Sequence, residues 1–281
     1  MAHTTTAARG GWRQPLAAKV PEITFLFWVL KLLTTAAGEA FSDFLATHGD
    51  AVAGAVEILI FVVAVALQFW TRRYAAVAYW FLALAIAIFG TGVADAMHLV
   101  VGIPYAGTTA LWAVVLAVIF WLWYRSEHTL SIHSITTTRR ELYYWATVFA
   151  TFALGTALGD FTATSLGLGY LTSAILFAVV ILIPAVAWRL GVNSVLTFWF
   201  AYVITRPLGA SISDYLSKPF GGGLGYGDLH VAIGLIGALV VLVAYTAVSR
   251  RDIQRPAAPA PPPARGRRIA PDPAAETPPR S

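Results

Sequence analysis

The sequence contains no cysteine, which excludes disulfide bonds, thiolate metal sites and a cysteine nucleophile. Charged residues are also scarce. They make up 12% of the 281 residues, whereas about 25% is typical of a soluble domain. Hydrophobic residues account for 58%, and the mean hydropathy is +0.70. A soluble chain of this length cannot bury so much apolar surface in one core, so the composition indicates an integral membrane protein.

Several catalytic signatures are missing as well. The chain has no His-rich metal motif, no Gly-x-Ser-x-Gly turn and no His-Glu-x-x-His spacing, so we expect neither an enzyme nor a cofactor. The net charge of +5 does not indicate nucleic-acid binding, because the basic residues are confined to particular loops. The expected partner is instead the lipid bilayer.

Eight apolar stretches follow one another along the chain, each about as long as the 20 residues that a bilayer-spanning helix needs. They lie near 23–45, 51–71, 75–98, 108–125, 142–165, 170–189, 194–216 and 229–248. The expected fold class is therefore all-α, a polytopic membrane bundle of eight transmembrane helices. Residues 1–20 are expected to form a cytoplasmic N-terminal segment. Residues 250–281, rich in Pro, Ala and Arg, are expected to form a disordered cytoplasmic tail.

Basic residues gather on one side of this eight-helix serpentine. They are Arg9, Arg13, Lys19, Arg72, Arg73, Arg125, Arg139, Arg140, Arg189, Arg250 and Arg251. The loops on the other side carry only Lys218. By the positive-inside rule, both termini are predicted to be cytoplasmic.

One spacing recurs four times: a Trp, a Gly ten residues later and an Asp five residues after that. The matches are Trp28–Gly38–Asp43, Trp80–Gly90–Asp95, Trp145–Gly155–Asp160 and Trp199–Gly209–Asp214. Each match falls in an odd-numbered span, which indicates four two-helix repeats over residues 21–73, 74–138, 139–193 and 194–249. Since every repeat contains two spans, all four point the same way across the membrane and are parallel repeats.

The rise of a helix gives this motif a geometry. Along each helix the Trp and Gly are about 15 Å apart, and the Trp and Asp about 22 Å apart. The Trp set is therefore predicted to lie toward the inner leaflet, with the four Asp at one shared depth toward the outer end. The Gly before the Asp permits either a close approach of two helices or a local break in the helix.

The four Trp residues at equivalent repeat positions suggest a resemblance to a known family. The chain resembles a family of bacterial membrane proteins of uncharacterised function, built of four tandem repeats that each contain two transmembrane regions and a characteristic Trp. The resemblance covers roughly residues 20–250. It implies a bacterial inner membrane protein, and it carries over no catalytic or substrate-binding residue.

Charged side chains inside spans are costly and by default mark function. Lys31 and Glu39 lie well inside the first span and Arg206 inside the seventh. Glu39 and Asp43 are four residues apart, so they share a helix face and can share a cation or a proton. Lys31 and Arg206 are each expected to face the interior with a carboxylate partner. The residues predicted to line an ion pathway are Lys31, Glu39, Asp43, Asp95, Asp160, Arg206 and Asp214.

A purely structural interpretation of the same residues is also open. The repeat Trp and Gly residues serve helix packing equally well, the Asp residues are suited to helix ends, and the basic residues to ion pairs. The asymmetry of the repeats argues against it, because only the first copy has Lys31 and Glu39 and only the fourth has Arg206.

These residues favour a transporter or permeation pathway for a small ion. With no Cys and only Met1 and Met97, the metal ligands on offer are oxygen atoms, which suit Mg²⁺, Ca²⁺ or Mn²⁺. The sequence does not identify a metal, and proton coupling through Glu39 or Asp43 is equally available. Two alternatives stay open: transport of a small organic anion by Lys31 and Arg206, and a non-transporting membrane scaffold or regulatory protein. Homo-oligomerisation is compatible with either.

Overall fold

The computed structural model describes residues 18–254, so the expectations for the two terminal segments lie largely outside the described residues. All regular structure in this range is helical, and eight helical spans are long and apolar enough to cross a membrane. The expected fold class, an all-α bundle of eight transmembrane helices, is confirmed. The chain is a multi-pass membrane protein.

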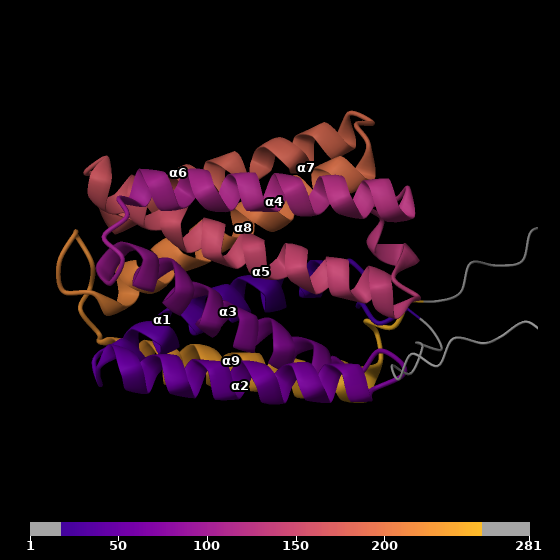
Figure 1. Ribbon diagram of the computed structural model, residues 1–281, viewed down its shortest axis with the longest axis horizontal. Coiled ribbons are helices and arrows are strands. Elements are labelled where there is room, and N and C mark those ends of the chain that lie inside the picture. Colours follow the sequence, from indigo (N-terminus) through magenta and orange to yellow (C-terminus); the bar gives the residue numbers. More distant parts are fainter. Residues whose placement is uncertain (1–17, 255–281) are drawn as a thin grey trace, which may run out of the picture.

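The spans alternate between two kinds along the chain (Figure 1). The odd-numbered spans are α1 (Phe25–Ala46), α3 (Ala76–Leu99), α5 (Thr138–Asp160) continued by the π turn η2 (Phe161–Ser165), and α8 (Ser194–Ser217). The even-numbered spans are α2 (Asp50–Trp70), α4 (Tyr105–Glu127), the consecutive pair α6 (Gly169–Val180) and α7 (Leu182–Arg189), and α9 (Asp228–Ser249). A short 3-10 turn, η1 (Ile132–Ser134), lies between α4 and α5.

Burial separates the two kinds of span into an inner and an outer set. In α1, α3, α5 and α8, between 61% and 72% of the most apolar stretch is buried inside the bundle, against 22% in each even-numbered span. The even-numbered spans are also more hydrophobic as a set, with mean hydropathies of 1.9 to 2.5 against 1.2 to 2.0 in the odd-numbered spans. A helix that is apolar all round and mostly uncovered suits a lipid-facing position. The four inner helices are where polar residues are protected from lipid.

The inner helices form a closed ring, and the outer helices connect the copies. In the ring, α1 packs against α3, α3 against α5, α5 against α8, and α8 against α1. Each outer helix packs mainly on the inner helix of the following copy: α2 on α3, α4 on α5, and α6 on α8. The last helix, α9, packs on α1 and so completes the circle. In Figure 1, α2 and α9 run along one side of the bundle and α4, α6 and α7 along the other.

The four repeat glycines make the close contacts of this ring. A Cβ atom at any of them would crowd or overlap the neighbouring inner helix. The contacts are Gly38 with Ala87, Gly90 with Phe152, Gly155 with Arg206 and Gly209 with Thr35. Every one of these partners stands seven residues after the repeat Trp of its own helix. The same contact therefore recurs four times around the ring, and the predicted role of the glycines in close helix approach is confirmed.

Both ends of the described chain meet at one end of the bundle, on the right in Figure 1. We call it the terminal end, and the opposite end the distal end. At the terminal end, the Glu22 N–H donates to the Asp252 carbonyl at 2.8 Å. The Tyr74 hydroxyl donates to the Asp252 carboxylate, and burial together with that carboxylate raises the pKa of Tyr74. The first bond holds the N-terminal and C-terminal segments side by side, and the second ties the C-terminal segment to the loop between α2 and α3.

A buried ion pair reinforces the terminal end. Lys19 Nζ lies 2.9 Å from Glu141 Oε1, and both side chains are almost inaccessible to solvent. The Gln68 amide also donates to Glu141 at 2.9 Å. Lys19 thus serves as more than a flanking charge, because it ties the segment before α1 to α2 and α5.

Candidate functional site

An ion pair between α1 and α8 lies in the interior of the inner ring. Arg206 Nη2 is 2.7 Å from Glu39 Oε2, and the two side chains are 0% and 3% exposed. Two hydroxyls complete the group. Thr91 of α3 donates to Glu39 at 2.9 Å and also contacts Arg206. Thr156 of α5 lies 2.7 Å from Arg206 Nη2 and 3.2 Å from Glu39. The expectation that Arg206 faces the interior beside a carboxylate is confirmed.

The repeat explains how these side chains come together. Glu39, Thr91 and Thr156 all stand eleven residues after the Trp of their own copy, so the ring brings them to one level. The fourth copy has Ala210 there. It contributes instead Arg206, which reaches the same level from one turn closer to the terminal end. Four equivalent helices thus supply a carboxylate, two hydroxyls and a guanidinium to one polar centre.

The surroundings of Lys31 differ from the expected carboxylate partner. Its ammonium is buried in the interior, but it has no hydrogen-bond or ion-pair partner among the described residues. It lies 3.8 Å from the centre of the Phe152 ring and 4.1 Å from that of Tyr202. The predicted carboxylate partner of Lys31 is therefore wrong. Two aromatic faces take that place, in a cation–π arrangement.

The geometry of α1 explains this difference. Lys31 and Glu39 are eight residues apart on one helix, a rise of about 12 Å, and Arg206 occupies Glu39 from the neighbouring helix. Glu57 of α2, a further buried carboxylate, is engaged elsewhere, since the Ser42 hydroxyl donates to it at 2.6 Å. Arg206 Nε is also without a partner among the described residues.

A second cluster of acids lies between the polar centre and the distal end. Glu39, Asp43 and Asp214 each offer one carboxylate oxygen, and the three atoms lie within 4.8 Å of one another. The prediction that Glu39 and Asp43 share one helix face is borne out. Asp214 joins them from α8. Such a set of oxygens is suited to hold a hard cation.

Lys218, in the loop after α8, covers the distal side of this cluster. Its ammonium lies 2.8 Å from Asp43 and 3.2 Å from Asp228. Burial by itself lowers the pKa of Lys218, but the Asp43 carboxylate and the other nearby acids raise it further. The net result is a pKa above the ordinary lysine value, so Lys218 keeps its positive charge at neutral pH.

The remaining repeat acids belong to the same region. Asp95 interacts electrostatically with Asp160 and Asp43, and Asp160 with Glu39 and Asp43. Each repeat Asp lies close to the distal end of its helix, as the motif predicted. The repeat Trp residues lie in the other half. Trp80, Trp145 and Trp199 are buried, and Trp199 donates to the Leu130 carbonyl at 2.9 Å.

A family model described as a repeat of unknown function, DUF347, matches residues 26–74, 78–129, 143–190 and 197–252. The chain belongs to the DUF347 repeat family. Four tandem matches confirm the internal repeat and the family resemblance that the Trp spacing indicated. No curated protein and no solved structure matches the chain. The description of the DUF347 repeat assigns no activity, so the chemistry rests on the residues themselves.

Sequence reasoning missed several residues of this DUF347 protein. Thr91 and Thr156 are ordinary hydroxyls in apolar helices, and the signal that marks them is their repeat position, which they share with Glu39. Tyr202, one of the two rings that contact Lys31, is likewise inconspicuous in a helix rich in aromatic residues. Aligning the four DUF347 repeats on their Trp residues identifies all three, because Tyr202 stands three residues after Trp199, the position that Lys31 holds after Trp28.

Proposed function

We propose that this DUF347 protein is a membrane transporter or permeation pathway for a small cation, with protons as the transported or coupled species. One observation carries the proposal: Glu39 belongs both to the buried pair with Arg206 and to the distal acidic cluster. A cation that enters from the distal end has to displace the Lys218 ammonium from Asp43 and then meets three carboxylate oxygens. Its binding there competes with Arg206 for the same carboxylate.

The ligand atoms restrict the cation. Carboxylate and hydroxyl oxygens in the absence of thiol and thioether ligands favour hard divalent ions such as Mg²⁺, Ca²⁺ or Mn²⁺. Three carboxylates so close together repel one another when all are charged, which favours uptake of either a proton or a metal ion. The fully buried Arg206 fills the middle of the ring. Passage therefore requires the pair between Arg206 and Glu39 to open.

Lys31 is the group that we assign to proton exchange. The charged groups near it are Arg206 on α8 and, through Arg206, Glu39 on its own helix. Phe152 and Tyr202 supply only ring faces, and among the described residues α3 and α9 bring no acid within ion-pair distance. With no fixed acceptor, the charge of Lys31 depends on the neighbouring pair. Cation binding at Glu39 frees Arg206 and so favours release of a proton from Lys31.

The orientation is part of the proposal. The charged loops at the terminal end carry most of the Lys and Arg residues outside the spans, which favours a cytoplasmic location for both termini. In a bacterial inner membrane, the acidic cluster would then face the outside. Homo-oligomers are compatible with this arrangement.

The test is ion flux in liposomes that contain the purified full-length chain. Proton, Mn²⁺ and Ca²⁺ fluxes are followed with entrapped dyes. We expect Asp43→Asn and Asp214→Asn to lower cation flux by roughly tenfold or more, since a contact to a charged group contributes about 1.5–3 kcal/mol. Both variants leave the pair between Arg206 and Glu39 in place, so a loss of flux is distinguishable from a loss of folding. Asp50→Asn, an exposed carboxylate at the same end, is the matched control and should retain full flux.

Glu39→Gln extends this test, because it keeps the shape of the side chain and removes its charge. We expect the loss of both cation and proton flux in protein that elutes as a folded species. Unchanged flux in folded Glu39→Gln protein would show that the pathway lies elsewhere. A wild-type protein that moves no ion at all would favour the scaffold alternative.

A small organic anion is the second candidate, and one observation favours it. Lys31, Arg206 and Glu39 together carry an excess positive charge when Lys31 is protonated, and the Lys31 ammonium has no anionic partner among the described residues. Flux of a small carboxylate that is abolished by Lys31→Met, with cation flux absent, would favour this candidate over the first.

A further inference from the structure

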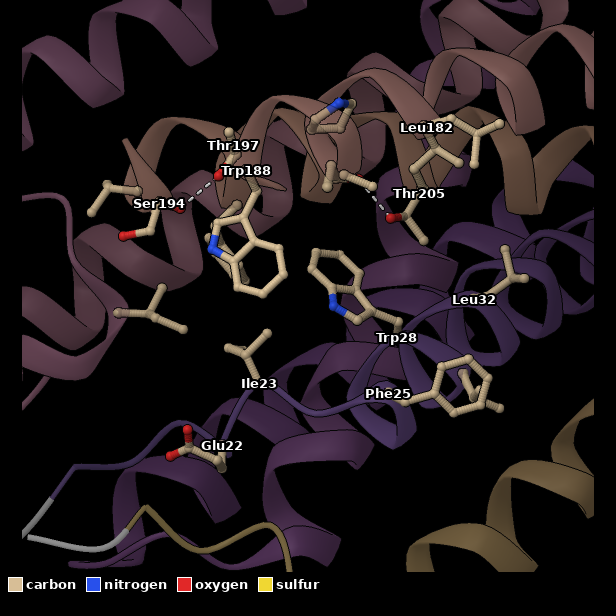
Figure 2. Close-up of a pocket in the computed structure, with 18 of the residues that line it drawn as sticks. Glu22, Ile23, Phe25, Trp28, Leu32, Leu182, Trp188, Ser194, Thr197 and Thr205 are labelled. Atoms are coloured by element: carbon tan, nitrogen blue, oxygen red, sulfur yellow. Dashed lines mark hydrogen bonds between the residues drawn. The ribbon is translucent and has the colours of Figure 1, made fainter. Parts of the chain in front are cut away.

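A cleft of about 840 Å³ lies in the terminal half of the molecule, away from the cluster of Glu39, Asp43 and Asp214 (Figure 2). Its walls are α1, α7 and α8, and the segment before α1 and the η1 turn close its terminal end. Several of the side chains that line it are exposed on the outside of the bundle, including Phe25, Leu182 and Trp188. The cleft therefore opens sideways, toward the lipid.

A break in the third copy accompanies this opening. The outer helix of that copy is interrupted at Ile181 and continues as α7, which contains Pro184, whereas α2, α4 and α9 are continuous. The first-copy Trp28 lies on the opposite wall. It is only partly buried and faces Trp188 across the cleft, although the other three repeat Trp residues are buried. These two departures from the repeat pattern, the interrupted outer helix and the partly exposed Trp28, thus lie in one groove.

The lining changes character along the membrane normal. Polar groups gather at the terminal end of the cleft: Glu22, Ser131, His133 and Ser194. Leu32, Leu182 and Leu208 line the deeper part. Ser194 and Leu208 are separated by about 21 Å of helix rise, which exceeds the roughly 15 Å of one hydrocarbon leaflet. A molecule with a polar head and an apolar chain fits this gradient from the interface to the middle of the bilayer.

We propose that the cleft binds one phospholipid with an amine headgroup, such as phosphatidylethanolamine, from the leaflet at the terminal end. The volume is within the range of ligand sites in proteins, about 300–1,000 Å³, and the lining is dominated by apolar side chains. The acyl chains lie between Trp28 and Trp188 and against the leucines. The headgroup lies at the polar end.

Charge selects the headgroup. Among the residues that line the cleft, Glu22 is the one acid, and no Lys or Arg is among them. The bond from its N–H to the Asp252 carbonyl fixes the Glu22 backbone at the terminal end of the cleft, and Figure 2 shows its carboxylate there. A carboxylate attracts the ammonium of phosphatidylethanolamine and repels an anionic headgroup such as phosphatidylglycerol. Ser131 and Ser194 offer hydroxyl donors for the phosphate.

Native mass spectrometry of the full-length chain in mild detergent tests the proposal, with equal amounts of phosphatidylethanolamine and phosphatidylglycerol added. We expect one phosphatidylethanolamine to be retained in preference to phosphatidylglycerol. Glu22→Gln should reduce that preference by roughly tenfold, as expected for one charge-assisted contact of about 1.4 kcal/mol. Trp188→Leu should reduce retention of the lipid itself.

The matched control is Trp121→Leu on α4, because Trp121 and Trp188 are equally exposed, at 58% and 57%. Both positions are on the outside of the bundle, so neither variant is expected to disturb folding, and melting curves verify this. Equal lipid retention in the two tryptophan variants would overturn the proposal. So would a headgroup preference that Glu22→Gln leaves unchanged, or the absence of any preference in the wild type.

Discussion

At the scale of single residues, the four copies differ most clearly at the position seven residues after the repeat Trp. The four copies place Thr35, Ala87, Phe152 and Arg206 there, each packed against the repeat Gly of the preceding inner helix in the ring. One copy thus supplies the buried guanidinium and another the ring beneath Lys31. The backbone contact is shared, while the chemistry differs from copy to copy. A site at the centre of four equivalent helices needs this asymmetry to hold a single ion pair.

Lys31→Met is the prediction at this scale. A buried ammonium without a polar partner costs several kcal/mol, of which two ring contacts recover about 2 kcal/mol each at most. Methionine has a similar length and no charge. We expect the thermal stability of the variant in detergent to equal or exceed that of the wild type. Arg206→Met, by contrast, leaves Glu39 buried without its counter-ion and should lose about 3–5 kcal/mol. A Lys31→Met protein as unstable as Arg206→Met would contradict the absence of a partner for Lys31.

The sequence predicted which charged residues lie inside, but not all of their partners. Arg206 and Glu39 could be identified as interior groups because the cost of charge in a span is the same wherever the helix packs. Lys31 could pair with Glu39 only if no other cation did. The packing of α1 against α8 places Arg206 beside Glu39 instead. Lys31 was therefore assigned a carboxylate, where the fold gives it two aromatic rings.

At the scale of the helices, the close contact between α5 and α8 depends on Gly155. A Cβ there would overlap the Arg206 side chain and crowd Pro207. We expect Gly155→Ala to force the two helices apart and lower stability by about 1–3 kcal/mol, the usual cost of overpacking. Gly54→Ala on α2 is the control, because nothing lies within 4 Å of an added Cβ at that position. Alanine is the better helix former by about 1 kcal/mol, so this variant should be neutral or stabilising. Thermal unfolding of both proteins in one detergent checks the difference, and equal melting temperatures would contradict it.

Sequence reasoning located the helices and the glycine contacts because both depend on local chemistry. Apolar length specifies a span, and a small residue at a fixed repeat position permits close approach. It treated residues 170–189 as one uninterrupted segment, whereas the helix breaks at Ile181. An apolar run gives no indication of such a break, since proline occurs in spans without ending them. The cleft that accompanies the break was for the same reason not predicted.

At the scale of the whole molecule, the orientation is the quantity to measure. Both described ends of the chain lie at the terminal end, where the basic loops also lie. We expect a reporter that functions only in the cytoplasm to be active when it is fused after Ser281. A reporter that functions only outside the cell should be inactive at the same position. A fusion active only on the outer side would reverse the proposed orientation and place the acidic cluster on the cytoplasmic face.

The repeat predicted four parallel units but not which outer helix covers which inner one. A two-helix unit can fold back on itself or reach across to its neighbour, and the same apolar face serves both arrangements. The structure has the second arrangement, with α2 on α3 and α9 on α1. The choice depends on the geometry of the loops between helices, which composition does not reveal.

The contact between α9 and α1 has a consequence for the order of synthesis. Among the described helices, the first to leave the ribosome, α1, is covered by the last, α9, about two hundred residues later in the chain. Until α9 enters the membrane, the face of α1 that it covers must lie against lipid or an insertion factor. The ion pair between Lys218 and Asp43 also forms late, because Lys218 lies in the loop between α8 and α9. The inner helices of copies two, three and four are each covered by an outer helix that is already made, but the inner helix of copy one stays uncovered until α9 is made. A ribosome that stalls in the final copy would therefore leave the earliest helix, with Glu39 and Lys31 on it, as the least protected part of the nascent chain.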